Sequence, residues 1–321
     1  MRIRLAGAPV VVLATLLAAC GSSAGGGNGA ASKGSGKATT MRIAGNTNAA
    51  ALPVWVAQDQ GFFDKCGVEA KYTVVENITT LPAALGKSFD IALSVPPILI
   101  AAAANGIPIV EVAGATLNTP ENPQTFLVVG PNSGIKSIKD LAGKTLGVQT
   151  ITGSTHLGTK LWMKRAGVPE ASVKIVQVDG PAQGPQLESG RIDAVETLAP
   201  FSTSVLKIGK SILDPQSSIA PSISGIFWTA DRDWATKNSD AVSCFQNSLA
   251  KATDFIKANE EKAKAVLQKQ TKLPADVVKT TVLPTYIPDV RPADLTLWEN
   301  AMKEVGGFKG DVSVATLTLQ H

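Results

Sequence analysis

Strand-like and helix-like segments alternate along most of this chain, and that alternation limits the folds open to it. The strand-like runs lie at residues 41–45, 68–75, 89–93 and 109–112 and again at 125–129, 145–149, 173–178, 193–197 and 212–213. The segments between these runs carry apolar residues at helical spacing. This order predicts an α/β protein with parallel sheets and helices on both faces. A Pro- and Asn-rich stretch at 118–124 divides the pattern into two units.

The same short motif recurs in both units. Gly86 precedes a strand that begins near Asp90, and Gly190 precedes one that begins near Asp193. We interpret each glycine as a helix C-terminal cap and each aspartate as a strand-start residue, so neither needs a functional role. The repeat indicates two similar lobes.

The amino terminus has the features of an export signal. Arg2 and Arg4 precede an apolar run at residues 5–17 that is too short to cross a membrane. The tetrapeptide that ends at Cys20 resembles a bacterial lipobox, which implies that residues 1–20 are a lipoprotein signal and that Cys20 carries the lipid. An ordinary secretory signal is the alternative. The resemblance places the mature protein on the outer face of the cytoplasmic membrane, held by its lipid anchor only.

Residues 21–40 are almost entirely Gly, Ser, Ala and Lys, which predicts a flexible tether. Twenty such residues would hold the folded part about 25 Å from the bilayer. The formal charge of the whole chain is +4, and without Arg2 and Arg4 it is 4 − 2 = +2. That bias is too small to indicate nucleic-acid binding.

Two cysteines remain in the expected mature chain besides Cys20. Cys66 and Cys244 form an even pair in an exported protein, so we expect a disulfide, although two separate buried thiols would fit the sequence as well. We expect no metal site and no cofactor, because the chain has only two histidines, His156 and His321, and no cysteines at ligand spacing.

The stretch at 145–201 carries the clearest functional signal. An apolar run at 145–149 meets a turn of small residues and then a helix that starts near Ser154. Ser154 and Thr155 are N-cap candidates, so the first free amides of this helix should point into the turn. Such an end suits an anion, but an ordinary helix cap would leave the same pattern.

Four passages resemble one protein family. They cover residues 52–76, 84–114, 140–168 and 190–201 and include the strings GKSFDIALS and GSTHLGTK. In these passages the chain resembles substrate-binding proteins of ABC importers of the nitrate, sulfonate and taurine type, a family that also includes binders of thiamine precursors. The similarity extends over about 41–235.

The resemblance implies a two-lobed periplasmic-binding-protein-like fold with two crossing strands and a ligand cleft between the lobes. Lobe 1 would comprise residues 41–128 and 225–321, and lobe 2 residues 129–224. The crossings would lie near 125–129 and 224–230. Cys66 and Cys244 would then share a lobe, where a bridge leaves the cleft free to move.

The resemblance also implies a set of ligand-binding positions at the carboxyl ends of strands. These positions are Asn46, Thr47, Ser94, Val95, Gly153, Ser154, Thr155, His156, Glu196, Leu198 and Phe201. The chain departs from the family pattern where relatives often carry a tryptophan and an acidic residue, because Leu198 and Ala199 stand there.

Three of these positions have a structural alternative. Ser94 could cap the helix that follows it, and His156 could bond to its own turn. Glu196 would repel a bare anion, so it either pairs with a cationic group of the ligand or points elsewhere.

The predicted function is solute binding without catalysis. We expect a monomer that captures a small anionic solute, of sulfonate, nitrate or taurine type, and presents it to an ABC permease. The alternatives are a binder of a thiamine-precursor pyrimidine or another aromatic or carboxylate ligand, an exported enzyme on the same fold, and an adhesin or structural lipoprotein. A hydrolase would need a nucleophile beside its base, and no G-x-S-x-G sequence occurs.

Overall fold

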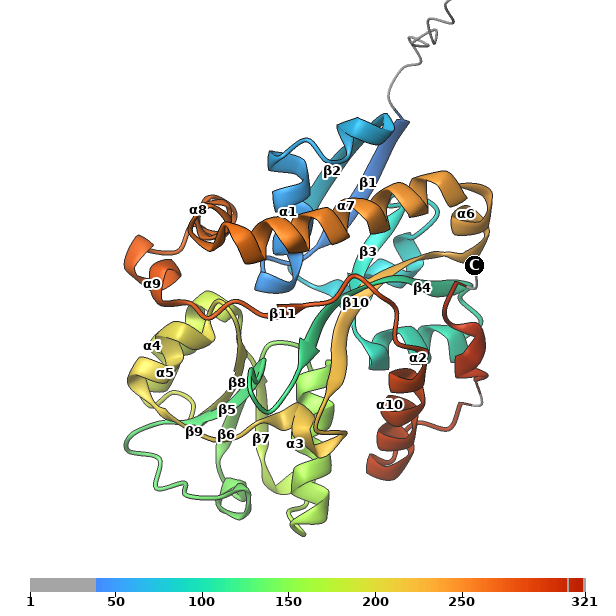
Figure 1. The fold of residues 1–321 in the computed structure, drawn as a ribbon. Helices are drawn as coiled ribbons and strands as arrows, with labels where there is room; N and C mark the ends of the chain where they lie inside the picture. Colours follow the sequence, from blue (N-terminus) through green and yellow to red (C-terminus); the bar gives the residue numbers. More distant parts are fainter. Residues whose placement is uncertain (1–38, 311, 320–321) are drawn as a thin grey trace, which may run out of the picture. The chain divides into compact units, whose positions relative to one another are not determined.

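Two mixed β-sheets form the framework of the computed structural model, which describes residues 39–310 and 312–319 (Figure 1). The first sheet consists of β1 (Thr39–Gly45), β2 (Val68–Val74), β3 (Ile91–Ser94), β4 (Ile109–Asn118), β10 (Ile223–Asp231) and β11 (Thr285–Tyr286). The second consists of β5 (Thr125–Val129), β6 (Thr145–Val148), β7 (Lys174–Gln177), β8 (Ala194–Leu198) and β9 (Lys210–Leu213). Their strand orders are β11-β4-β10-β3-β1-β2 and β7-β6-β8-β5-β9.

The two sheets share one topology. In the first, β1 lies parallel to β2 and β3, and β10 lies antiparallel between β3 and β4. In the second, β6 lies parallel to β7 and β8, and β5 lies antiparallel between β8 and β9. The predicted α/β fold with two lobes is confirmed, but the crossings predicted near 125–129 and 224–230 lie elsewhere, because those residues form β5 and β10 inside the sheets. The chain leaves the first sheet after β4 and returns to it at β10, so its two crossings lie at 119–124 and 214–222.

A repeated hydrogen bond supports the equivalence of the lobes. The backbone amide of Arg42 in β1 donates to Asp90 Oδ2 at 2.8 Å, across 48 residues. The amide of Thr145 in β6 donates to Asp193 Oδ2 at the same distance and across the same 48 residues. The two aspartates therefore connect the start of β3 to β1 and the start of β8 to β6.

Helices cover the sheets. They are α1 (Leu52–Asp59), α2 (Pro96–Ala104), α3 (Ser154–Arg165), α4 (Gly180–Glu188), α5 (Ser202–Ile208), α6 (Arg232–Lys237), α7 (Ser239–Ala258), α8 (Glu260–Thr271), α9 (Ala275–Thr280) and α10 (Pro292–Val305). Helix α1 packs on α7 and α8, and α10 packs on both α2 and α3 (Figure 1). None of the helices in the described ranges is long and apolar enough to cross a membrane.

The first lobe holds the larger core. Trp228 of β10 meets the rings of Tyr72 and Phe245 edge to face, with centroid distances of 6.5 and 5.5 Å. In the second lobe Leu127 of β5 faces one core cluster and Val128 faces another, so this inner strand is buried on both sides. Burial of both faces explains why β5 continues as the apolar run Phe126–Val129 after Thr125.

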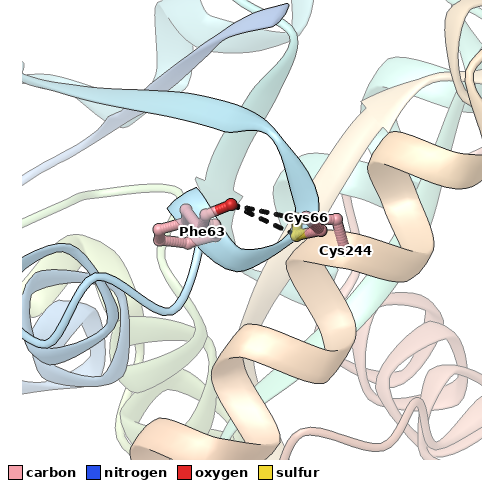
Figure 2. The surroundings of a disulfide bond; sticks show 3 residues. All are labelled: Phe63, Cys66 and Cys244. Carbon is pink, nitrogen blue, oxygen red and sulfur yellow. Dashed lines mark hydrogen bonds between the residues drawn. A yellow bond between two sulfur atoms is a disulfide. The ribbon is translucent and has the colours of Figure 1, made fainter. Parts of the chain in front are cut away.

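A disulfide joins two elements of the first lobe. Cys66 ends the 3₁₀ helix η2 (Asp64–Cys66), Cys244 lies on α7, and their Cα atoms are 6.1 Å apart. Figure 2 shows both sulfur atoms beside the carbonyl oxygen of Phe63, at 3.3 and 4.0 Å. The ring of Phe63 stacks on Phe245 at a centroid distance of 6.2 Å, so aromatic packing flanks the bridge.

The chain differs from the sequence-based expectations near both ends. Thr39 and Thr40 begin β1 instead of ending the tether, and the expected signal, Cys20 and the rest of the tether lie outside the described residues. The alternating apolar run at 312–317 predicts a strand, but this prediction is wrong, because Val314–Thr316 forms the 3₁₀ helix η7. Within 312–319, the pairing with β4 is one isolated bridge, from Thr318 to Glu111.

Candidate functional site

A cavity of about 50 Å³ has walls from both lobes. It is lined by Asn46, Asn48, Ile78, Val95, Gln149, Thr150, Gly153, Ser154, Thr155, Glu196, Leu198 and Ile226. Most of these residues follow the carboxyl ends of β1, β3 and β6 or lie in β8, as expected for a ligand site in open α/β sheets. The space suits a small solute or the head group of a larger one.

The start of α3 forms one wall of the cavity. Gly153 is the N-cap, in an extended conformation, and no side chain caps the helix. The first backbone bond runs from the Leu157 amide to the Gly153 carbonyl at 3.0 Å, so the amides of Ser154, Thr155 and His156 precede the helical ladder. These amides and the helix dipole together form an anion-binding end.

The prediction that Ser154 or Thr155 caps this helix is wrong, because the helix begins one residue earlier than a serine cap would allow. Ser154 is the first helical residue, and its Oγ accepts a hydrogen bond from Gln216 Nε2 at 3.2 Å. Gln216 belongs to the 3₁₀ helix η6 (Pro215–Ser218) on the return crossing. Because Gln216 donates to the Ser154 side chain, that side chain does not cap the helix. The first amides of α3 are therefore available to a ligand.

Two asparagines form the opposite wall, in the turn after β1. Asn48 Nδ2 donates to Asn46 Oδ1 at 2.6 Å, and Asn48 Oδ1 accepts from the amide of Ala50 at 2.8 Å. Tyr72 fixes this turn by donating its hydroxyl to the Asn46 carbonyl at 2.9 Å. Within the described residues Asn46 Nδ2 has no hydrogen-bond partner, so it can donate to a ligand.

A buried pair of titratable residues stands beside the cavity. His156 Nδ1 and Glu196 Oε1 are 2.8 Å apart, and the two residues are 1% and 2% exposed. The Glu196 carbonyl also accepts from Gln183 Nε2 at 3.1 Å. Glu196 lines the cavity and His156 does not, so the histidine positions the carboxylate from behind. Neither Glu196 Oε2 nor the buried His156 Nε2 has a partner among the described residues.

Five further predicted positions differ in how they lie relative to the cavity. Val95 and Leu198 line the cavity. Thr47 is half-buried and lies outside the lining, and Ser94 is buried beside Val95 with no partner for its Oγ in the described structure. Phe201 also lies outside the lining, because its ring packs onto Gly180, where a Cβ would come within 2.3 Å of it.

Sequence reasoning missed five lining residues, which are Asn48, Ile78, Gln149, Thr150 and Ile226. The first could have been found, because it shares the polar turn of Asn46. Gln149 and Thr150 directly follow β6, so the strand-end rule that selected Ser94 would also have selected them. Ile78 and Ile226 carry no local signal, since only the tertiary fold brings them to the cavity.

The lobes meet next to the cavity. The amide of Ala49 in the first lobe donates to the Ala199 carbonyl in the second at 3.1 Å, and Tyr286 donates its hydroxyl to the Ala49 carbonyl at 2.9 Å. Further away, Arg165 of α3 pairs with Glu304 of α10, with Nε 3.0 Å from Oε1. These contacts join the two lobes on either side of the site.

No group of three or more His, Cys, Asp or Glu side chains in the described ranges could hold a metal ion. The lining also contains no Lys, Arg or aromatic residue, and Glu196 is its one charged member. Recognition of a solute there depends on backbone amides, amide side chains and this carboxylate.

Relatives by sequence include transport and biosynthesis proteins. A Haemophilus influenzae protein provisionally named a thiamine biosynthesis protein is 27% identical over 217 residues, which are 65% of each chain. The taurine-binding periplasmic protein of Escherichia coli is 28% identical over 130 residues, which are 40% of each chain. This chain thus spans less than two thirds of the length of either relative.

Solved structures share the fold. The periplasmic aliphatic sulphonate-binding protein SsuA of Escherichia coli matches with a TM-score of 0.67 at 19% identity, over 82% of this chain and 90% of that one. The desulfurization enzyme DszB matches with a TM-score of 0.56 at 14% identity, over 83% and 91%. A family model described as NMT1/THI5-like matches residues 48–263, which is more than half of the sequence. The chain therefore belongs to the NMT1/THI5-like family.

Proposed function

We propose that this protein is an extracytoplasmic solute receptor that captures a small organic anion and delivers it to an ABC permease in the cytoplasmic membrane. The observation that carries the proposal is the start of α3 on the wall of a cavity between the lobes, where the unpaired amides of Ser154 and Thr155 belong to lining residues. Sulphonate and taurine, the ligands that two of the similar proteins are named for, are small organic anions or carry an anionic group.

Closure of the cleft supplies the mechanism. The α3 amides belong to the second lobe and Asn46 Nδ2 to the first, so a solute completes both sets of hydrogen bonds only when the lobes meet. Binding then shifts the protein toward the closed arrangement, which a permease could distinguish from an open one. We place the lobe boundaries at the crossings, with residues 39–118 and 223–319 in one lobe and residues 125–213 in the other.

The proposal includes a lipid anchor on Cys20 and a monomeric protein. Replacing Cys20→Ser should release the protein from membranes into the soluble fraction, because the acyl chains would be its only attachment. Membrane fractionation of both forms tests this. If the wild-type protein is found entirely in the soluble fraction, the lipid anchor is refuted. The proposal that the protein binds a solute would still stand.

Titration calorimetry tests the receptor itself. We expect binding to at least one member of a panel of sulfonates, nitrate, carboxylates and thiamine-like pyrimidines, the last included because of the thiamine-biosynthesis relative. Asn46→Ala should weaken that binding by about 10-fold through loss of one buried hydrogen bond. Ser189→Ala, at an exposed position after α4, serves as the control and should bind like the wild type. If no compound of the panel binds, the proposal is refuted.

We propose no catalytic role. The described contacts give the His156 side chain one partner, the carboxylate of Glu196, and place no hydroxyl or thiol in hydrogen bond with it. Nucleophilic catalysis needs such a pair.

A further inference from the structure

The charge balance of the cavity does not suit a simple anion. Glu196 is the one charged side chain of the lining, is 2% exposed, and has a single side-chain partner, His156. No described residue donates to Glu196 Oε2, so this oxygen can accept a hydrogen bond from a solute in the cavity, and a carboxylate in so buried a place favours such a donor. A bare anion at the α3 amides would add a second negative group to the same small space.

We infer that the solute is a short zwitterion, with an anionic group at the first turn of α3 and a cationic nitrogen that donates to Glu196. This inference rests on the proposed function and names the class of solute for the same site. An ammonium group would meet the free Oε2, while His156 holds Oε1. Charge-assisted bonds of this kind are shorter and stronger than neutral ones.

The distance between the two ends of the solute must be small. His156, the third residue of α3, contacts Glu196 directly at 2.8 Å, so the carboxylate adjoins the turn whose amides would hold the anion. The cavity measures only about 50 Å³. Both facts favour a chain of a few atoms between the two charged groups.

The rest of the lining suits an aliphatic chain. Ile78, Val95, Leu198 and Ile226 supply branched aliphatic surface, and no aromatic ring is present to stack on a planar ligand. Leu198 follows Glu196 by two residues on β8, which places both side chains on the same face of the strand. One strand therefore provides the contact for the nitrogen and the contact for the carbon chain.

Matched probes test the inference by calorimetry on the wild-type protein. Taurine and ethanesulfonate differ by one amino group, and so do β-alanine and propionate. We expect the amine of at least one pair to bind about 10-fold or more tightly than its amine-free partner, and comparison of the two pairs identifies the preferred anion. Glu196→Gln should bring that ratio close to one. Glu111→Gln removes another buried carboxylate, outside the cavity, and should preserve the ratio.

The outcomes separate this inference from the proposal beneath it. If ethanesulfonate or propionate binds the wild-type protein as tightly as its amine, the zwitterion is refuted and the anion receptor stands. If none of the four probes binds while nitrate or a pyrimidine does, the zwitterion is again refuted alone. If nothing in either panel binds, both fail. The wild-type ratio decides the matter even if Glu196→Gln does not fold.

Discussion

At the scale of single residues, Glu111 is the clearest case of a side chain controlled by its surroundings. It lies on β4 in the first lobe and is 1% exposed. Burial raises the pKa of Glu111 from 4.5 to about 8, and the nearby Asp294 adds to the increase, while a hydrogen bond from the Arg291 backbone opposes it. The carboxyl group is therefore protonated in the folded protein at a pH where the unfolded chain has lost the proton.

The raised pKa of Glu111 makes the protein less stable as the pH rises. The folded state holds the proton of Glu111 more tightly than the unfolded chain does. The stabilisation that results is fully present below the unfolded pKa and is lost as the pH rises toward about 8. We expect the free energy of unfolding to fall by up to about 1.4 kcal/mol per pH unit within this window. Urea unfolding at several pH values measures the slope. Glu111→Gln should flatten it, and an unchanged slope in that variant would contradict the assignment.

At the scale of elements, α3 is fixed to the return crossing by a close backbone approach. A Cβ on Gly158 would lie 2.3 Å from the Pro215 carbonyl oxygen, and Trp162 Nε1 donates to the Asp214 carbonyl at 3.3 Å. The carboxylate of Asp214 in turn accepts from Asn118 and Thr125, which flank the outgoing crossing, at 2.6 Å each. The helix that carries the anion-binding end is thus connected to both crossings.

Gly158→Ala tests this connection. The added methyl group has only rigid backbone to meet, so we expect a loss of about 1–3 kcal/mol in unfolding free energy, together with weaker solute binding as α3 shifts. Gly184→Ala is the matched control on α4, because its methyl group would meet the mobile end of Ile208 at 3.2 Å. There we expect no loss, or a gain of up to about 1 kcal/mol. Thermal unfolding of both variants gives the comparison.

The elements themselves could largely be predicted from the sequence. Apolar runs predicted every strand of both sheets except the two-residue β11, including the edge strands β2, β7 and β9, which are only partly buried. The expected strand at 312–317 failed because alternation alone does not show whether a sheet edge is free. In the site, the residues that follow strand ends could be predicted from the sequence. The packing of the Phe201 ring on Gly180 could not, because it depends on tertiary contacts that leave no local sequence pattern.

At the scale of the whole molecule, the disulfide and the cleft should act independently. The bridge between Cys66 and Cys244 closes a separation of 178 residues, yet both cysteines belong to the first lobe. Replacing both cysteines by serine should lower the free energy of unfolding by up to about 5 kcal/mol. Solute affinity should stay the same, because the lobes can still close. Denaturant unfolding and calorimetry on the same samples measure the two effects, and a parallel loss of affinity would show that the bridge supports the site.

The position of β10 has a consequence for the order in which the chain can fold. This strand lies between β3 and β4, so the first sheet has a gap at its centre until residues 223–231 are present. All strands of the second sheet, by contrast, come from the continuous segment 125–213. A ribosome therefore releases everything needed for the later sheet before the earlier one can close. Under the export that we propose, that delay would keep the amino-terminal part unfolded for longer, which suits passage through a translocation channel.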